Sequence, residues 1–296
     1  MPTDPCTRVS LKRVSPMANT LVQDLVESGI HFGQRASGWN PKMQPYIYGK
    51  RNGIHIIDIK ETIKGLLLAK KFISKVVADG KDVCFVGTKR QAKNVIETRV
   101  PDVKMHFVTE RWLGGTLTNF RTIRQRLRRL EELEAIEQND NFASYSKKME
   151  SQLKREQKKI FRNLNGIRKM DKLPGAMIVV DVKSEITALK EARKLNIPTI
   201  CLIDTDGDPS LADIAIPGND DSMRAIDVII RELCLAVAAG MEQRNATPPA
   251  GEAAPAEQAA PAGPRRSRRA QFRAEDAGGE PGRIEISTEP SAGVPS

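Results

Sequence analysis

The chain has 296 residues, of which 40% are hydrophobic and 28% charged, and its formal net charge at pH 7 is +10. This length and hydrophobic content suffice for a globular core and exclude a wholly disordered chain. The sequence has no apolar run near the roughly eighteen residues that a membrane span needs. Its four cysteines lack a CxxC pair, so we expect a reduced, cytoplasmic protein.

The N-terminal stretch divides at Met17, and the sequence leaves open whether translation starts at Met1 or at Met17. Residues 1–17 carry basic side chains without apolar periodicity, and we expect a disordered extension there. The following NTLVQDLVESG places Leu21, Leu25 and Val26 on one helical face before a glycine, which predicts a short amphipathic helix.

The next stretch, residues 31–53, is rich in Gly, Pro and Asn. This composition predicts a structured loop with aromatic and basic side chains, with at most a short strand near Tyr46–Tyr48.

Strands and helices then alternate along the chain. Apolar strands are predicted in IHIIDI, DVCFVGT, VKMHFVT, GAMIVVDV, IPTICLID and IAIPG, with helices over about 61–78, 90–98, 185–195 and 221–239. Apolar strands separated by helices are typical of a parallel sheet that is covered on both faces. The predicted fold class is α/β, with a doubly wound, mainly parallel sheet of Rossmann or flavodoxin type.

Helical spacing interrupts this alternation after VKMHFVT. Two apolar stripes, separated by NDN at 139–141, predict an antiparallel coiled-coil helical hairpin inserted into the α/β body. The stripes consist of Phe120, Ile123, Leu127, Leu130 and Leu133, and of Phe142, Tyr145, Met149, Leu153, Ile160 and Leu164.

The hairpin segment also carries most of the excess positive charge. From Arg111 to Lys172 there are sixteen Lys and Arg residues against eight Asp and Glu residues. A solvated helix face is the alternative explanation, but such faces normally interleave both signs. The first turns lack acids entirely, so the segment predicts an anionic partner, most simply a phosphate backbone. These first turns carry Arg121, Arg124, Arg126, Arg128 and Arg129.

The predicted domain organisation follows from these patterns. Residues 18–110 and 171–240 form the α/β domain, residues 111–170 form the inserted basic hairpin, and residues 241–296 form a disordered Ala/Pro-rich tail. The basic cluster RRSRR in the tail is interpreted either as a weak nonspecific attraction for RNA or as part of a solvated linker.

Enzyme motifs are incomplete. CFVGTKRQAK places Gly87 between a strand and a helix but lacks the further glycines of a dinucleotide loop and is not a Walker P-loop. The sequence has no GxSxG or HExxH motif, and His55 and His106 are expected to be strand residues. We therefore expect no catalytic residue and no enzyme.

A metal site is a weaker hypothesis. Acidic residues at strand ends, with a histidine nearby, have the ligand types for a structural Mg²⁺ or Zn²⁺. The alternative is that the carboxylates in DTDGDPS cap a turn, so no metal or other cofactor is expected to be required. The candidate ligands are His31, Asp181, Asp204 and Asp206.

The aromatic residues gather beside cations. Trp39, Tyr46, Tyr48 and Trp112 lie near basic residues in the sequence, a combination suited to base stacking and phosphate pairing. Packing in the core is an equally good explanation for each ring.

Several long blocks resemble the bacterial small-subunit ribosomal protein two family. They include LVESGIHFGQRASGWNPKMQPYIYGKRNGIHIIDI, VGTKRQA, RWLGGTLTNF and IPGNDDSMRAI, and the resemblance runs in order from about Ala18 to Gly240. It implies a Rossmann-like domain with a protruding coiled-coil hairpin. It also implies a structural part of the small subunit that binds rRNA between head and body and helps to dock ribosomal protein one.

The resemblance, together with charge and position, assigns candidate rRNA contacts. The candidate contacts are Arg35, Trp39, Asn40, Lys42, Lys50, Arg51, Lys89, Arg90, Arg111, Trp112, Arg121, Arg124 and Arg128.

The sequence also departs from some relatives of this family. Gln34 stands where they carry a second histidine after HFG, which counts against a bound metal.

Two alternative functions are a nucleotide-binding enzyme at the sheet edge and an RNA-independent protein-docking module.

Overall fold

The structure is a computed structural model that describes residues 16–138 and 146–246. The expected N-terminal extension, up to residue 15, and the expected tail, from residue 247 onward, lie outside the described residues, as do Phe142 and Tyr145 of the second apolar stripe. Within the two described ranges, every helix is too short or too polar to cross a bilayer.

A five-stranded parallel sheet forms the centre of the fold. Its strands lie in the order β5-β4-β6-β7-β8, and each neighbouring pair is parallel. Counted among themselves these strands have the order 2-1-3-4-5, the flavodoxin-like doubly wound arrangement, which confirms the predicted α/β class. The strands are β4 (Val83–Val86), β5 (His106–Val108), β6 (Ala176–Val180), β7 (Thr199–Ile203) and β8 (Ile214–Pro217).

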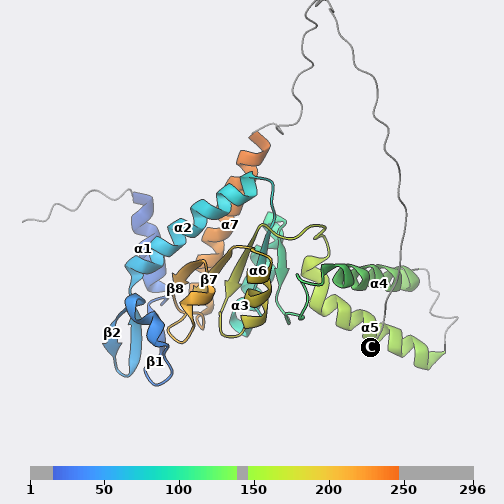
Figure 1. Cartoon of the computed structure of the whole chain (residues 1–296), viewed down its shortest axis with the longest axis horizontal. Coiled ribbons are helices and arrows are strands. Elements are labelled where there is room, and N and C mark those ends of the chain that lie inside the picture. The colour runs from blue at the N-terminus through green and yellow to red at the C-terminus, as the bar shows by residue number, and fades with distance from the viewer. Residues whose placement is uncertain (1–15, 139–145, 247–296) are drawn as a thin grey trace, which may run out of the picture. The chain divides into compact units, whose positions relative to one another are not determined.

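Alternate side chains of each strand point to opposite faces of this sheet. Val83 and Phe85 pack in one hydrophobic cluster with α2 (Ile59–Ala78), α3 (Arg90–Arg99) and α7 (Met223–Ala246). Figure 1 shows α2 and α7 side by side on that face.

The opposite face has its own core. Cys84 and Val86 pack in a second cluster with Leu189 of α6 (Ile186–Lys194). Because strands β4, β6 and β7 are buried along their whole length, their apolar residues run without a polar alternation.

The Gly-rich stretch before α2 forms a second, antiparallel sheet. Strands β1 (Phe32–Arg35), β2 (Ile47–Arg51) and β3 (Ile54–Ile57) lie in the order β1-β3-β2. The short strand expected near Tyr46–Tyr48 overlaps β2, but the expected loop also contains β1, and IHIIDI is not part of the parallel sheet. The missed signal is Asn52-Gly53, whose positive φ angles of 50° and 78° form the two-residue turn of a hairpin.

Two long helices, α4 (Phe120–Gln138) and α5 (Lys147–Leu164), lie between β5 and β6 in the chain and contact one another (Figure 1). Gln157 on α5 hydrogen-bonds Glu137 near the end of α4, whereas Arg124 near the start of α4 reaches the segment after α5. The first turns of α4 and the end of α5 pack against the sheet, because Ile123, Leu127 and Leu164 belong to its second core cluster.

The two ends of the described chain differ slightly from expectation. Helix α1 (Pro16–Glu27) confirms the predicted helix, but it includes Pro16 and Met17, which were expected in the disordered extension, and Val26 is 44% exposed rather than on the buried face. Helix α7 continues to Ala246, so residues 241–246 are helical and do not belong to an unstructured tail.

Candidate nucleic-acid interface

Doubly wound folds usually bind ligands at the carboxyl edge of the parallel sheet. In this protein, charged side chains that pair with one another occupy that edge. Lys89 follows β4, and its Nζ lies 2.7 Å from Asp220 and 2.6 Å from Asp221 in the loop before α7. Asp181 at the end of β6 is 3.9 Å from the same ammonium. The Lys89 side chain is only 19% exposed. These contacts tie the ends of β4 and β6, the topological switch point, to the start of α7.

The loop after β4 has the position of a phosphate loop but binds a carboxylate instead. The backbone N–H of Thr88 donates to Glu185 Oε1 at 3.2 Å, and the Thr88 hydroxyl donates to the same oxygen. Glu185 is buried, and this burial raises its pKa above the usual range. Since an internal carboxylate takes the donors that a nucleotide phosphate would need, the geometry argues against the nucleotide-enzyme alternative.

The acidic side chains beside Lys89 do not fit a divalent ion. Asp204, Asp220 and Asp221 approach within 4.8 Å of one another, and of these only Asp204 was a predicted ligand. Gln34 Nε2 donates to Asp204 at 3.2 Å and to Asp221 at 2.5 Å, while Lys89 donates to Asp220. Each carboxylate thus has an internal donor, and the Lys89 ammonium beside Asp220 and Asp221 would repel a divalent cation.

The other predicted metal ligands have separate partners. Asp181 accepts hydrogen bonds from the backbone of Lys183 and from Ser184, and Asp206 pairs with Lys183 at 3.1 Å. His31 is absent from the carboxylate cluster, and its Nδ1 has no partner among the described residues. The structure does not bring the four expected ligands together.

Burial changes the ionisation of this edge. It raises the pKa of Asp204 to about 6, with a smaller contribution from the neighbouring carboxylates Asp206 and Asp221. Burial, together with the surplus of carboxylates, also raises the pKa of Asp220, although Lys89 opposes the shift. Asp204 and Asp220 therefore hold a proton to higher pH than a free carboxyl group does, whereas burial of Asp221 is offset by hydrogen bonds from Lys89 and Gln34, which lower its pKa.

The block RWLGGTLT is organised around one buried carboxylate. Glu191 of α6, which is 7% exposed, accepts hydrogen bonds from the backbone N–H groups of Gly115 at 2.7 Å and Leu117 at 3.0 Å. It also accepts from Trp112 Nε1 at 3.3 Å. Burial alone would raise the pKa of Glu191, but these hydrogen bonds more than offset it and the pKa lies below its ordinary value.

This arrangement explains the glycine pair and corrects one expectation. Gly115 has a φ of 91°, a left-handed conformation that suits glycine and turns the chain around Glu191. Trp112 is 8% exposed and belongs to the core, so its indole face is not available for base stacking. The sequence offered no signal for Glu191, because it lies 74 residues along the chain from Leu117.

The predicted phosphate contacts divide into paired and unpaired cations. Lys89 is held inside, Lys42 pairs with Asp208 at 2.8 Å, and Arg124 pairs with Asp171 at 2.6 Å. The remaining predicted cations are exposed, and none has an acidic partner in the described part of the chain. They are Arg35, Lys50, Arg51, Arg90, Arg111, Arg121 and Arg128.

The small sheet provides both exposed cations and an exposed ring. Tyr48 on β2 is 80% exposed and lies in the same strand as Lys50 and Arg51. Trp39 is half-buried against His55, with ring centroids 5.2 Å apart. The side chain of Asn40 accepts from the backbone N–H of Lys42, so Asn40 has a structural role as a helix cap.

Sequence reasoning missed a second group of cations, on α5. Arg155, Lys158, Lys159 and Arg162 are exposed and recur at helical spacing of three and four residues, so they share one face. With Arg111 they line a hollow of about 580 Å³. The spacing was visible in the sequence, but the pairing of this face with Arg111 depends on the fold.

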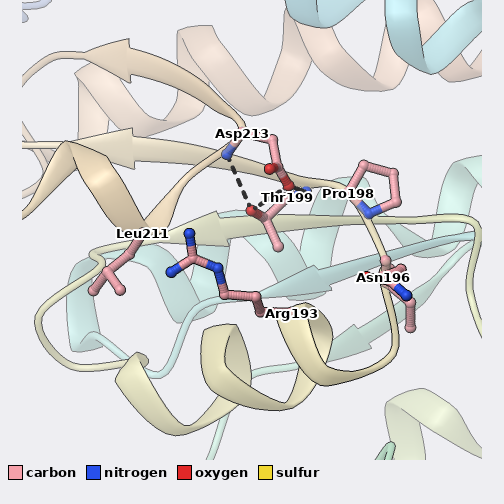
Figure 2. Close-up of a pocket in the computed structure, with 7 residues that line it drawn as sticks. Arg193, Asn196, Pro198, Thr199, Leu211 and Asp213 are labelled. Carbon is pink, nitrogen blue, oxygen red and sulfur yellow. Dashed lines mark hydrogen bonds between the residues drawn. The ribbon is translucent and has the colours of Figure 1, made fainter.

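A further hollow of about 340 Å³ lies at the opposite edge of the sheet, near the start of β7 (Figure 2). Asp213 accepts from the backbone N–H of Thr199 at 2.8 Å and from its hydroxyl at 3.1 Å. Figure 2 shows the Arg193 guanidinium extending between Leu211 and Thr199. Asp213 directly precedes β8, and its carboxylate hydrogen-bonds Thr199 at the start of β7. It therefore links these two strands and does not present a reactive group.

Comparisons with known proteins agree with a sheet edge at which charged side chains pair with one another and form no catalytic site. A family model described as ribosomal protein S2 matches residues 25–240. A protein named small ribosomal subunit protein uS2 from Rhodopirellula baltica is 56% identical over 245 residues, which cover 83% of this chain and 92% of that protein.

A protein of the same name from a Mycobacterium species is 46% identical over 242 residues, which cover 80% of this chain and 85% of that protein. These names confirm the expectation of a ribosomal protein rather than an enzyme. The chain belongs to the ribosomal protein S2 family.

Proposed function

We propose that the chain is a structural component of the small ribosomal subunit in the cytoplasm, and that it binds small-subunit rRNA through exposed cations on α4 and on the small sheet. Membership of the family supports the ribosomal role. The rRNA contact is supported by the cations whose charge the fold leaves unpaired.

The observation that carries this proposal is the outer surface of α4. Arg121, Arg126 and Arg128 are exposed, and no carboxylate among the described residues pairs with them. Arg121 and Arg126 have no acid three or four residues away. Arg128 has Glu131 and Glu132 at those positions but pairs with neither, whereas Arg129 pairs with Glu132. Free guanidinium groups on a rigid helix are suited to phosphate oxygens, which they bind in a bidentate way.

The small sheet would add a second contact of the same kind. Arg35, Lys50 and Arg51 supply positive charge, and Tyr48 supplies an exposed ring on which an unpaired base can stack. Affinity in this arrangement comes from many weak cation contacts, and specificity comes from the shape of the folded RNA.

We further propose that α4 and α5 form a coiled-coil hairpin inserted as residues 111–170 between the two parts of the α/β domain, residues 18–110 and 171–240. The buried side chains Leu130 and Leu133 on α4 and the half-buried Leu153 and Ile160 on α5 support a seam between the helices.

Docking of ribosomal protein one belongs to the proposal through the family resemblance, as a contact of the α/β body that does not need RNA.

Sedimentation of the tagged full chain from lysate of its source organism tests the ribosomal role. We expect the chain to travel with small subunits at low salt. A variant with R121Q, R126Q and R128Q should be lost at lower salt than the wild type, because each exposed phosphate contact contributes about 1 kcal/mol. The matched control carries K60Q, K71Q and K75Q on the exposed face of α2, which removes the same charge.

Two outcomes would count against the proposal. A wild-type chain that stays at the top of the gradient at low salt contradicts the ribosomal role. Equal retention of the α4 variant and the α2 control contradicts the contact through α4. Deleting residues 116–170 is a poorer test, since Leu117, Leu164 and Met170 from this segment lie in the core.

A further inference from the structure

The inner half of α5 and the segment after β5 form a groove whose lining is strongly positive at one end and aromatic at the other. Two hollows, of about 580 Å³ and 600 Å³, share Glu110, Lys158, Arg162 and Asn163 in their walls and are therefore adjacent. The first is lined by the cations Arg111, Arg155, Lys158, Lys159 and Arg162.

Two acids line the groove, Glu97 in the second hollow and Glu110 in both hollows, and neither pairs with Arg111, Lys158 or Lys159. Glu110 pairs with Arg162 at 2.6 Å and with Lys93, and hydrogen bonds from these two cations lower its pKa to about 2. The Glu110 carboxylate is thus already paired with Arg162 and Lys93. Among the residues that the structure describes, Arg111, Lys158 and Lys159 have no acidic partner.

The spacing of the α5 cations is unfavourable for the helix alone. Arg155 and Lys159 are four residues apart, as are Lys158 and Arg162, and like charges at this spacing destabilise a helix by roughly 0.2–0.5 kcal/mol per pair. A purely structural role for the stripe is therefore disfavoured. Residues that lower the stability of their own helix are found at binding sites, where contacts with the ligand compensate for the loss.

The second hollow adds a surface for a base. Phe161 lies on α5 in the wall of that hollow, beside Lys158 and Arg162, and its side chain is 46% exposed. Exposed aromatic rings next to cations stack on unpaired bases irrespective of sequence, while the cations hold the backbone.

We propose that this groove binds an unpaired stretch of RNA strand, with backbone phosphates along Arg155, Lys158 and Lys159 and a base stacked on Phe161. The distance along the helix from residue 155 to residue 162 is about 10 Å at 1.5 Å per residue, enough for more than one phosphate. This inference rests on the proposed rRNA-binding function and assigns it a site that is separate from the α4 arginines.

The test measures binding of the full-length chain to in-vitro-transcribed small-subunit rRNA of the source organism over a series of salt concentrations. The groove variant carries R155Q, K158Q and K159Q, and the control carries K60Q, K71Q and K75Q. We expect the groove variant to bind at least tenfold more weakly. The slope of its log affinity against log salt concentration should be shallower by about two, since each lost contact with single-stranded RNA reduces that slope by about 0.7. The control should change both quantities less.

A second variant tests the base contact separately. F161A should weaken rRNA binding by about tenfold without changing the salt dependence, because stacking releases no counterions. The conservative F161L should keep only part of the affinity. The thermal unfolding midpoint of the groove variant should equal or exceed that of the wild type, because the groove cations repel one another in the free protein.

The outcomes separate the groove from the general function. If the wild type binds rRNA and the groove variant matches the α2 control in affinity and salt dependence, the groove is not an RNA site, whereas the proposed function stands. If the wild type itself shows no salt-dependent binding, the proposed function is wrong. An F161A protein with wild-type affinity would exclude the stacked base.

Discussion

The carboxyl edge of the sheet and the helices α4 and α5 both contain many ionic residues, but the fold treats them in opposite ways. At the edge, Lys89 is enclosed by Asp220 and Asp221 with distances of 2.6–2.7 Å. On α4, Arg121, Arg126 and Arg128 are exposed without a described acidic partner. A cation near a ligand-binding position therefore indicates an interface only when the fold leaves its charge unpaired.

The comparison predicts that interior charges govern folding and exterior charges govern RNA binding. Each of the following changes should affect the free energy of unfolding while leaving the salt dependence of rRNA binding unchanged, in contrast to the variants on α4 and α5. A change in that salt dependence would show that the two regions are not as separate as the structure indicates.

Glu191→Ala should have the largest effect. It leaves the N–H groups of Gly115 and Leu117 and the indole N–H of Trp112 without their acceptor inside the core. We expect a loss of about 4 kcal/mol in the free energy of unfolding, measured by urea denaturation. Glu191→Gln, which keeps an acceptor oxygen, should lose less, and an equal loss in both variants would show that hydrogen bonding is not the cause.

Lys89→Met should come next, with a loss of about 3 kcal/mol. It leaves Asp220 and Asp221 together without their shared cation, and an uncompensated buried charge is costly. Urea unfolding of Lys89→Met, Asp220→Asn and the double variant forms the test. The double variant should be more stable than the sum of the single losses predicts, and strict additivity would contradict the ion pair.

The pH dependence of stability should give the smallest of the three effects. The pKa of Asp204 is about 6 in the folded state, above its ordinary value of 3.8, so the folded protein holds this proton more tightly than the unfolded chain does. Stability from this group is fully present below about pH 4 and is lost as the pH rises to about 6.

Comparison with Asp204→Asn isolates this effect. The difference in free energy of unfolding between wild type and variant should change by roughly 2 kcal/mol between pH 4 and pH 7, in the direction that favours the wild type at low pH. Chemical denaturation at a series of pH values measures it. A constant difference would mean that Asp204 is ionised across the whole range.

Much of the fold was accessible from the sequence because its signals are local. Uninterrupted apolar strands such as AMIVV and TICLI predicted the buried parallel sheet, and helical periodicity predicted α4 and α5. The small sheet was missed because its strands are only four or five residues long and lie in a Gly-rich stretch. The hairpin signal at Asn52-Gly53 was present but was interpreted as part of a loop.

The candidate interface was only partly accessible. The excess of basic residues and the resemblance to a ribosomal family are properties of the sequence, and the comparisons confirm the family. Whether a given cation is free is decided by residues far along the chain, as for Lys89 and Asp220, which are 131 residues apart. Trp112 likewise lies beside Arg111 in the sequence, which favours an interface, but in the folded protein its side chain lies in the core.

Periodicity, composition and long matching blocks are carried by neighbouring residues, so they predict the fold class, the position of the basic helices and the family. Three features depend instead on the folded chain: Glu185 takes the donors of the phosphate loop, Glu191 organises RWLGGTLT, and the α5 cations meet Arg111 in one groove. The physical reason is that charges and hydrogen bonds are satisfied by whichever groups the fold brings within about 3 Å, regardless of their separation in the chain.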